Sequence, residues 1–196
     1  MKVFILSTHI LTGPIGSGKT YVQKILERNN FSCFCADEIV RKLYNDNNTI
    51  LFIKKISPEL ILNNKIILEN LRKLIFTNRD IMKKVENYIQ PLVFEEFKNI
   101  ENNSKNNKNL IFIMPIIINN NFFKKYKIIY IDTKKNIRIN RIKYRQGYDD
   151  EMIKSIMEYQ EAIDIYKNNN YIYIDNNSSI ENLDNSIELL INKLHE

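Results

Sequence analysis

The segment TGPIGSGKTYVQKIL, from Thr12 to Leu26, decides the fold of this chain. The apolar run at residues 3–12 predicts a buried strand before it, and Lys19–Glu27 carries apolar side chains at the spacing of an amphipathic helix. Between them, Gly13–Thr20 matches the whole pattern G-x-x-x-x-G-K-[ST] in its required strand–helix context. The sequence therefore predicts a phosphate-binding loop, the P-loop, that holds a nucleoside triphosphate.

The residue types of this loop suit a phosphate ligand. Glycines let the backbone turn so that successive N–H groups point at phosphate oxygens, and the helix N-terminus adds a favourable dipole. We expect Lys19 to reach the β- and γ-phosphates of ATP and the hydroxyl of Thr20 to bind Mg²⁺. The predicted nucleotide-binding residues are Gly13, Gly16, Ser17, Gly18, Lys19, Thr20 and Tyr21. A glycine-rich turn that only caps a helix is disfavoured, because motif and context are both complete.

Composition and charge narrow the class of protein further. With 196 residues, 44% of them hydrophobic, the chain suits one globular domain that can hold an inserted subdomain. The net charge of +6 comes from lysines spread along the chain. A nucleic-acid groove would instead need basic residues clustered together with aromatic ones. We therefore expect no nucleic-acid partner.

The sequence gives little indication of a membrane-spanning helix or of a disulfide bond. No apolar run approaches the roughly 18 residues of a spanning helix, and Ser7, Thr8 and His9 interrupt the apolar N-terminus. Cys33 and Cys35 lie two apart in a predicted strand, at the far limit of disulfide geometry, with no neighbouring Cys or His to complete a zinc site. Reduced thiols in a cytoplasmic protein without a membrane partner are the expectation.

Short strand patterns alternate with helical ones beyond the loop, which predicts parallel βαβ units and an α/β sheet. The further predicted strands are Phe31–Cys35, Leu110–Met114, Ile128–Ile131 and Tyr171–Ile174. The further predicted helices are Ile39–Leu43, Ile66–Phe76, Arg79–Glu101, Lys134–Arg145, Asp150–Tyr166 and a C-terminal helix with a capping box at Ser178 and Glu181. Residues 49–102 should be helical without a strand of their own, and Pro91 should break or kink its helix.

Asp37 is the acidic residue that follows the second predicted strand. Ligands of open α/β sheets bind at the carboxyl ends of the strands, where this residue falls. A carboxylate there could take the proton of a substrate hydroxyl and orient the hydroxyl toward a γ-phosphate. It could equally cap a helix that begins at Glu38. The local sequence does not separate these two roles.

The stretch TGPIGSGKT followed by CADEIVRKL resembles the dephospho-CoA kinase family, whose pattern is T-G-G-I-G-S-G-K-S and then D-A-D-x-I-A. Weaker similarities follow in the family's order: LRKLIFTN and VENYIQPLV, IFIMPIII, RINRIKYRQ and YIDNN. The resemblance implies a P-loop kinase fold, with a five-stranded parallel sheet flanked by helices, a helical insertion and a small lid. It also implies phosphorylation of the ribose 3′-hydroxyl of dephospho-CoA by MgATP, the last step of CoA biosynthesis.

The expected organisation follows from this resemblance together with the helical pattern. The nucleotide-binding core comprises residues 1–48, 108–133 and 168–196, the substrate-binding insertion residues 49–107, and the lid residues 134–167. We expect a monomer, although the sequence does not determine the oligomeric state.

The resemblance assigns catalytic roles to four residues: Lys19, Asp37, Arg141 and Arg145. Asp37 is the expected base or orienting group. Arg141 and Arg145, four apart on a predicted lid helix, should close over the triphosphate. The alternative for this pair is a solvated basic helix face, because Lys134, Lys135, Arg138 and Lys143 are close in sequence.

The chain departs from the family pattern at five positions, several of which lie on the acceptor side in the family. The departures are Cys35, Leu68, Gln90, Asn119 and Gln146. A kinase for another small acceptor, such as a nucleoside or nucleotide, therefore stays open. So do a nucleotide-dependent switch or ATPase, in which Asp132 would organise Mg²⁺, and a basic RNA-binding protein with an incidental loop.

Overall fold

The computed structural model describes residues 7–104, 109–115, 121–163 and 171–195. Five strands form one parallel sheet in the order β2-β5-β1-β6-β7. The strands are β1 (Ser7–Thr12), β2 (Ser32–Cys35), β5 (Asn109–Ile113), β6 (Lys127–Asp132) and β7 (Ile172–Asp175). The predicted five-stranded parallel sheet is confirmed.

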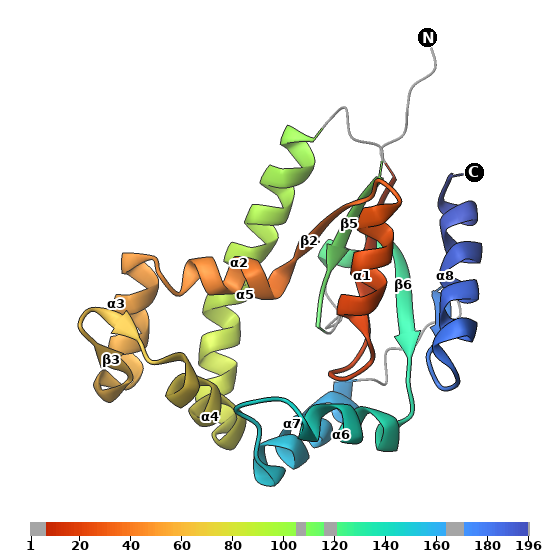
Figure 1. Cartoon of the computed structure of the whole chain (residues 1–196). Helices are drawn as coiled ribbons and strands as arrows, with labels where there is room; N and C mark the ends of the chain where they lie inside the picture. Colours follow the sequence, from red (N-terminus) through yellow and green to blue (C-terminus); the bar gives the residue numbers. More distant parts are fainter. Residues whose placement is uncertain (1–6, 105–108, 116–120, 164–170, 196) are drawn as a thin grey trace.

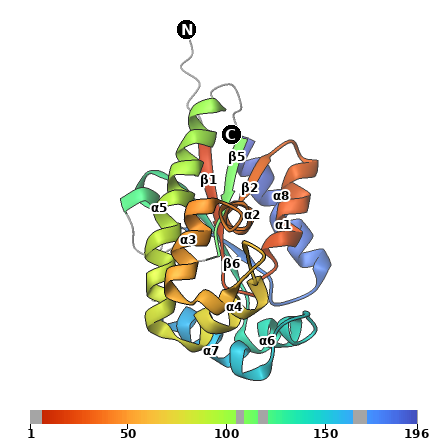
Figure 2. The same cartoon turned by 90° about the vertical axis from the view of Figure 1, so that its left-hand side faces the viewer.

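Both faces of the sheet are covered by helices, which explains why its central strands are continuous apolar runs. On one face, Leu11 of β1 packs with side chains of α1 (Lys19–Arg28) and α8 (Ile180–His195). On the other face, Ile10 belongs to a cluster that includes side chains of the long helix α5 (Arg79–Asn103). In Figure 1 the sheet lies between α5 and α8, and Figure 2 shows α1 on the same side of the sheet as α8.

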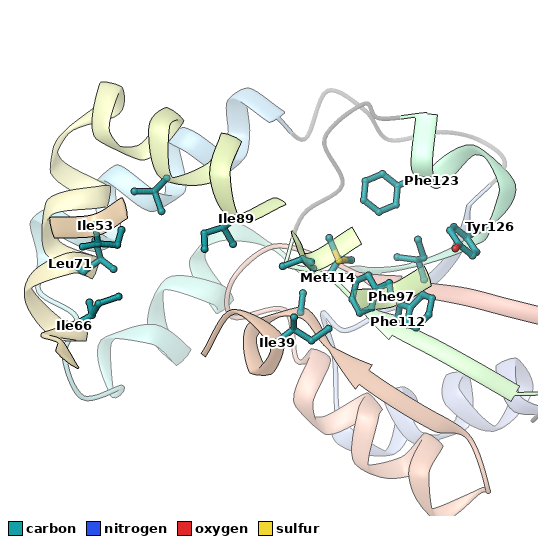
Figure 3. Close-up of a cluster of buried hydrophobic side chains, with 14 of the residues drawn as sticks. Ile39, Ile53, Ile66, Leu71, Ile89, Phe97, Phe112, Met114, Phe123 and Tyr126 are labelled. Carbon is teal, nitrogen blue, oxygen red and sulfur yellow. The ribbon is translucent and has the colours of Figure 1, made fainter. Parts of the chain in front are cut away.

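The insertion shares its core with the sheet. The residues expected to form the insertion, 49–107, contain most of α3 (Asn47–Ile56), the hairpin β3 (Ile61–Leu62) and β4 (Lys65–Ile66), α4 (Leu68–Thr77) and α5, whereas α2 (Ala36–Leu43) lies in the expected core. One buried cluster runs from Ile53 and Leu71 to Phe97 of α5 and Phe112 of β5 (Figure 3). The rings of Phe97 and Phe112 stack with centroids 4.2 Å apart. The insertion is therefore held by the same apolar core as the sheet.

Two expectations for this region are wrong. Residues 49–102 do contain strands, because β3 and β4 pair across Asn63 and Asn64, which both adopt positive φ angles. An Asn-Asn pair suits such a two-residue turn, but strands of two residues are too short to show an alternating pattern. The break expected at Pro91 is absent, since α5, which is 25 residues long, runs through it, and a kink there stays a prediction. Buried Ile89 and Val93 pack on either side of Pro91 and hold the helix in place.

The expected lid, residues 134–167, contains α6 (Lys135–Lys143) and α7 (Asp150–Ile163). Figure 2 shows both helices at the end of the molecule where α4 lies, and α7 contacts α4. The last helix, α8, is capped by Ser179, whose Oγ accepts from Asn182 N at 3.2 Å, and not by the predicted pair Ser178 and Glu181. Within the described residues, no helix is both long and apolar enough to cross a membrane.

Candidate active site

The P-loop connects the end of β1 to α1, and two of its glycines cannot be replaced without strain. Gly16 and Gly18 have φ angles of +80° and +102°, in the left-handed region that side chains other than glycine rarely adopt. A Cβ at Gly16 would lie 2.8 Å from the carbonyl oxygen of Arg138, and one at Gly18 would lie 2.6 Å from Nδ2 of Asn176. The glycine spacing thus reflects both the turn and the close approach of the lid and of the loop after β7.

Lys19 folds back over the loop that carries it. Its Nζ donates to the carbonyl oxygens of Gly13 at 2.6 Å and Pro14 at 3.3 Å. Burial lowers the pKa of Lys19 to about 8, while the negative charge of Asp37 acts in the opposite direction. The positive charge of Arg145 lowers this pKa further. Asp37 and Arg145 therefore both lie close enough to Lys19 for their charges to act on it.

The titration of Lys19 predicts a pH dependence of nucleotide binding. With a pKa of about 8 in the free protein, Lys19 is charged below that pH and neutral above it. A bound triphosphate favours the charged form and raises the pKa again. We expect the dissociation constant of MgATP to rise about tenfold per pH unit above the pKa, because binding must then take up a proton.

Titration calorimetry one pH unit below and one above this pKa, in two buffers of different ionisation enthalpy, measures both the affinity and the protons taken up. Proton uptake should be present only at the higher pH. A constant affinity without proton uptake would contradict the assigned titration.

Asp37 lies in the first turn of α2 with its side chain exposed to solvent. The helix begins at Ala36, and Cys35 is the N-cap residue without a side-chain capping bond. The expectation that Asp37 caps a helix starting at Glu38 is therefore wrong. The first turn stabilises a carboxylate through the helix dipole. Asp37 is thus an exposed carboxylate near the ammonium of Lys19, as a hydroxyl-orienting group requires.

The two lid arginines do not share a helix face. Arg141 lies in α6, and its guanidinium donates to the carbonyl oxygen of Gly16 and to Oδ1 of Asn176, both at 3.2 Å. Arg145 lies in the bend after α6, which ends at Lys143, so the predicted helix was too long. Arg141 therefore binds the P-loop, whereas Arg145 is exposed to solvent.

Arg138, one of the basic residues close to Arg141 and Arg145 in sequence, is not part of a solvated basic face. This residue is only 5% exposed, and its Nε donates to the carbonyl oxygen of Thr133 at 3.1 Å. Lys135 and Lys143 do face solvent, in ion pairs with Glu161 and Asp150. The sequence could not tell the buried guanidinium of Arg138 from these surface charges.

Tyr21 directs its side chain away from the P-loop. Its hydroxyl donates to Oδ1 of Asp184 in α8 at 2.8 Å, and its N–H donates to the carbonyl oxygen of Gly18. Thr20, by contrast, is exposed at the start of α1. A role of Tyr21 in nucleotide binding stays a prediction, and it would have to involve the main chain.

Three residues that the sequence patterns did not identify bind the P-loop from other segments of the chain. Asn176 donates from Nδ2 to the carbonyl oxygen of Ser17 at 2.7 Å, and Thr133 donates from Oγ1 to the same oxygen at 3.2 Å. Gln160 of α7 accepts from Ile15 N at 2.8 Å. Each is polar and buried. Buried polar side chains after strands are a usable signal, but their partners lie far away in sequence.

The residues at which the chain departs from the family pattern lie in different parts of the structure. Cys35 ends β2, and burial raises the pKa of its thiol. Leu68 begins α4, Gln90 lies in α5, and Gln146 follows Arg145 in the lid turn. Asn119 lies outside the described residues. Cys33 and Cys35 are free thiols that pack against the same cluster as α1.

Comparison with known proteins decides the family. The family model of dephospho-CoA kinase matches residues 9–182. The chain belongs to the dephospho-CoA kinase family. The dephospho-CoA kinase of Fusobacterium nucleatum subsp. nucleatum is 27% identical over 198 residues, which cover 96% of this chain and 97% of the relative. That of Rickettsia bellii (strain RML369-C) is 28% identical over 151 residues, covering 76% of this chain and 78% of the relative.

The fold agrees with this membership. The solved dephospho-CoA kinase from Campylobacter jejuni is similar with a TM-score of 0.65 and 22% identity, covering 95% of this chain and 96% of the other. Family membership makes the chain a kinase, a phosphotransferase with ATP as co-substrate. A kinase therefore replaces the two alternatives, a nucleotide-dependent switch or ATPase and a basic RNA-binding protein.

Proposed function

We propose that the chain transfers the γ-phosphoryl group of MgATP to the ribose 3′-hydroxyl of dephospho-CoA. The observation that carries the proposal is that Asp37, in the first turn of α2 just after β2, lies close enough to Lys19 of a complete P-loop for its charge to act on that ammonium. A proton acceptor and a phosphate-binding cation therefore lie near each other at one edge of the sheet. The family of the chain supports the acceptor.

The nucleotide would bind over the P-loop and the start of α1. Main-chain N–H groups there would hold the phosphates, and the ammonium of Lys19 would exchange the carbonyls of Gly13 and Pro14 for phosphate oxygens. Thr20 fits a magnesium ligand, because its hydroxyl is exposed beside Lys19. Mg²⁺ commonly binds through few protein oxygens together with substrate phosphates, and when bound it would neutralise phosphate charge.

Asp37 would act on the acceptor. Its carboxylate would accept a hydrogen bond from the acceptor hydroxyl, align it with the γ-phosphorus and take its proton as the bond forms. Arg141 and Arg145 would stabilise the negative charge on the transferring group, each from a different backbone segment.

Removal of the Arg145 guanidinium should separate transition-state binding from ground-state binding. For Arg145→Ala we expect kcat to fall about 10- to 100-fold, with less than a threefold change in MgATP affinity, because the phosphoryl charge grows during transfer. The matched control is Lys143→Ala, whose ammonium is paired with Asp150. If affinity and rate fell by equal factors, Arg145 would be a ground-state contact.

The acceptor is tested directly. The protein is incubated with MgATP and, separately, dephospho-CoA, adenosine, AMP and a buffer blank, and each product is identified by mass spectrometry and ³¹P NMR. We expect phosphate to appear only on dephospho-CoA, at the ribose 3′-oxygen. Preferential phosphorylation of adenosine or AMP would overturn the acceptor while leaving the kinase class intact.

A further inference from the structure

Asn176 connects three parts of the candidate site through one side chain. It directly follows β7, is 5% exposed, and its own N–H donates to the carbonyl oxygen of Asp132 at 2.9 Å. Its Nδ2 donates to the carbonyl oxygen of Ser17, and its Oδ1 accepts from Arg141. A side-chain amide is a donor at one end and an acceptor at the other, so it can bind the loop and the lid arginine together.

The contact to Ser17 determines the direction of the next N–H group. A trans peptide is planar, so its C=O and N–H bonds point in opposite directions. The Ser17 carbonyl is held by Asn176 at 2.7 Å and by Thr133 at 3.2 Å. These two donors on one side turn the N–H of Gly18 to the other side.

Gly18 is shaped by the same contact. Its φ angle is +102°, and a Cβ there would lie 2.6 Å from Nδ2 of Asn176. The amide of Asn176 therefore occupies the space that any other side chain at position 18 would need. The glycine of the motif and the buried amide fit each other, although they lie 158 residues apart.

We infer that Asn176 is a positioning residue for phosphoryl transfer, an inference that rests on the proposed function. It orients the Ser17–Gly18 peptide so that the Gly18 N–H can bind a phosphate, and it holds the guanidinium of Arg141 over the Gly16 carbonyl. Loss of the amide should loosen both groups at once, whereas loss of a purely structural contact would lower stability alone.

The test begins with Asn176→Asp, which keeps the shape and the acceptor for Arg141 but places an oxygen against the Ser17 carbonyl. We expect MgATP to bind about 10-fold more weakly or worse, because a buried carbonyl loses its donor. We expect kcat to fall about 10²-fold, as for a misplaced catalytic group. The control is Asn177→Ala, since the Asn177 side chain contacts Lys134 N and the Asp132 carbonyl instead of the loop.

A second variant, Thr133→Val, keeps the inference testable if Asn176→Asp does not fold. Thr133→Val removes the other donor to the same carbonyl and should weaken MgATP binding by a smaller factor, about threefold, without lowering Tm. Asn176→Ala combined with Arg141→Ala should lower kcat by less than the product of the single effects, because each substitution removes the same contact between the two side chains.

Two results would overturn the inference: unchanged MgATP affinity in Thr133→Val and in folded Asn176→Asp, or strictly multiplicative effects of Asn176→Ala and Arg141→Ala on kcat. The MgATP dissociation constant is independent of the acceptor. A different acceptor would therefore refute the proposed substrate and leave this inference testable.

Discussion

Lys19→Ala is expected to abolish measurable phosphoryl transfer while leaving the fold intact. Losing one preorganised donor to a developing charge costs about 10²–10³-fold in rate, and loss of ground-state phosphate binding adds to this. The stability of the free protein should not fall. Burial already disfavours the charged ammonium, as its lowered pKa shows, so its removal relieves a desolvation cost.

The measurement pairs initial rates with thermal unfolding of the wild type, Lys19→Ala and Lys24→Ala. Lys24 lies on the exposed side of the same helix, so its removal controls for lost charge and changed helix propensity. Wild-type turnover by a folded Lys19→Ala protein would refute the kinase mechanism at this loop.

The second large effect distinguishes two aspartates. Asp37→Asn keeps the shape of the side chain and removes the proton-accepting oxygen, so transfer should fall about 10²–10⁴-fold while MgATP still binds. Asp37 is not a helix cap, so the free energy of unfolding should change only modestly, through the lost first-turn dipole interaction, about 0.3–1 kcal/mol, and the lost attraction to Lys19. Rates are compared well below pH 8, because loss of this carboxylate also lowers the pKa of Lys19.

Asp132→Asn should be mild in the same assay. Asp132 ends β6, and its main-chain carbonyl, which accepts from Asn176, is unaffected by the substitution. Glu38→Gln, one residue from Asp37 and also exposed, is the matched control on α2. A near-normal Asp37→Asn with an inactive Asp132→Asn would reverse the assignment. It would indicate that Asp132 organises the metal, as in a nucleotide switch.

The sequence alone determined the features that rest on local rules. The P-loop, the strand before it and the helix after it lie within 22 consecutive residues, and their glycine and apolar spacing reflects backbone conformation and burial. Alternation of strands and helices predicted the parallel sheet, because parallel neighbours need crossover connections. Asp37 was placed at the edge of the sheet for the same reason.

Only the tertiary structure decided which polar side chains serve the loop. Arg138 and Arg141 lie three residues apart in one helix, yet the first is buried against Thr133 and the second binds Gly16. Asn176 and Gln160 reach Ser17 and Ile15 across 159 and 145 residues. Such contacts depend on how strands and helices pack, and packing joins residues that no local pattern relates. The sequence therefore indicated where phosphate binds, and the packing of β7, α6 and α7 determined what holds the loop in place.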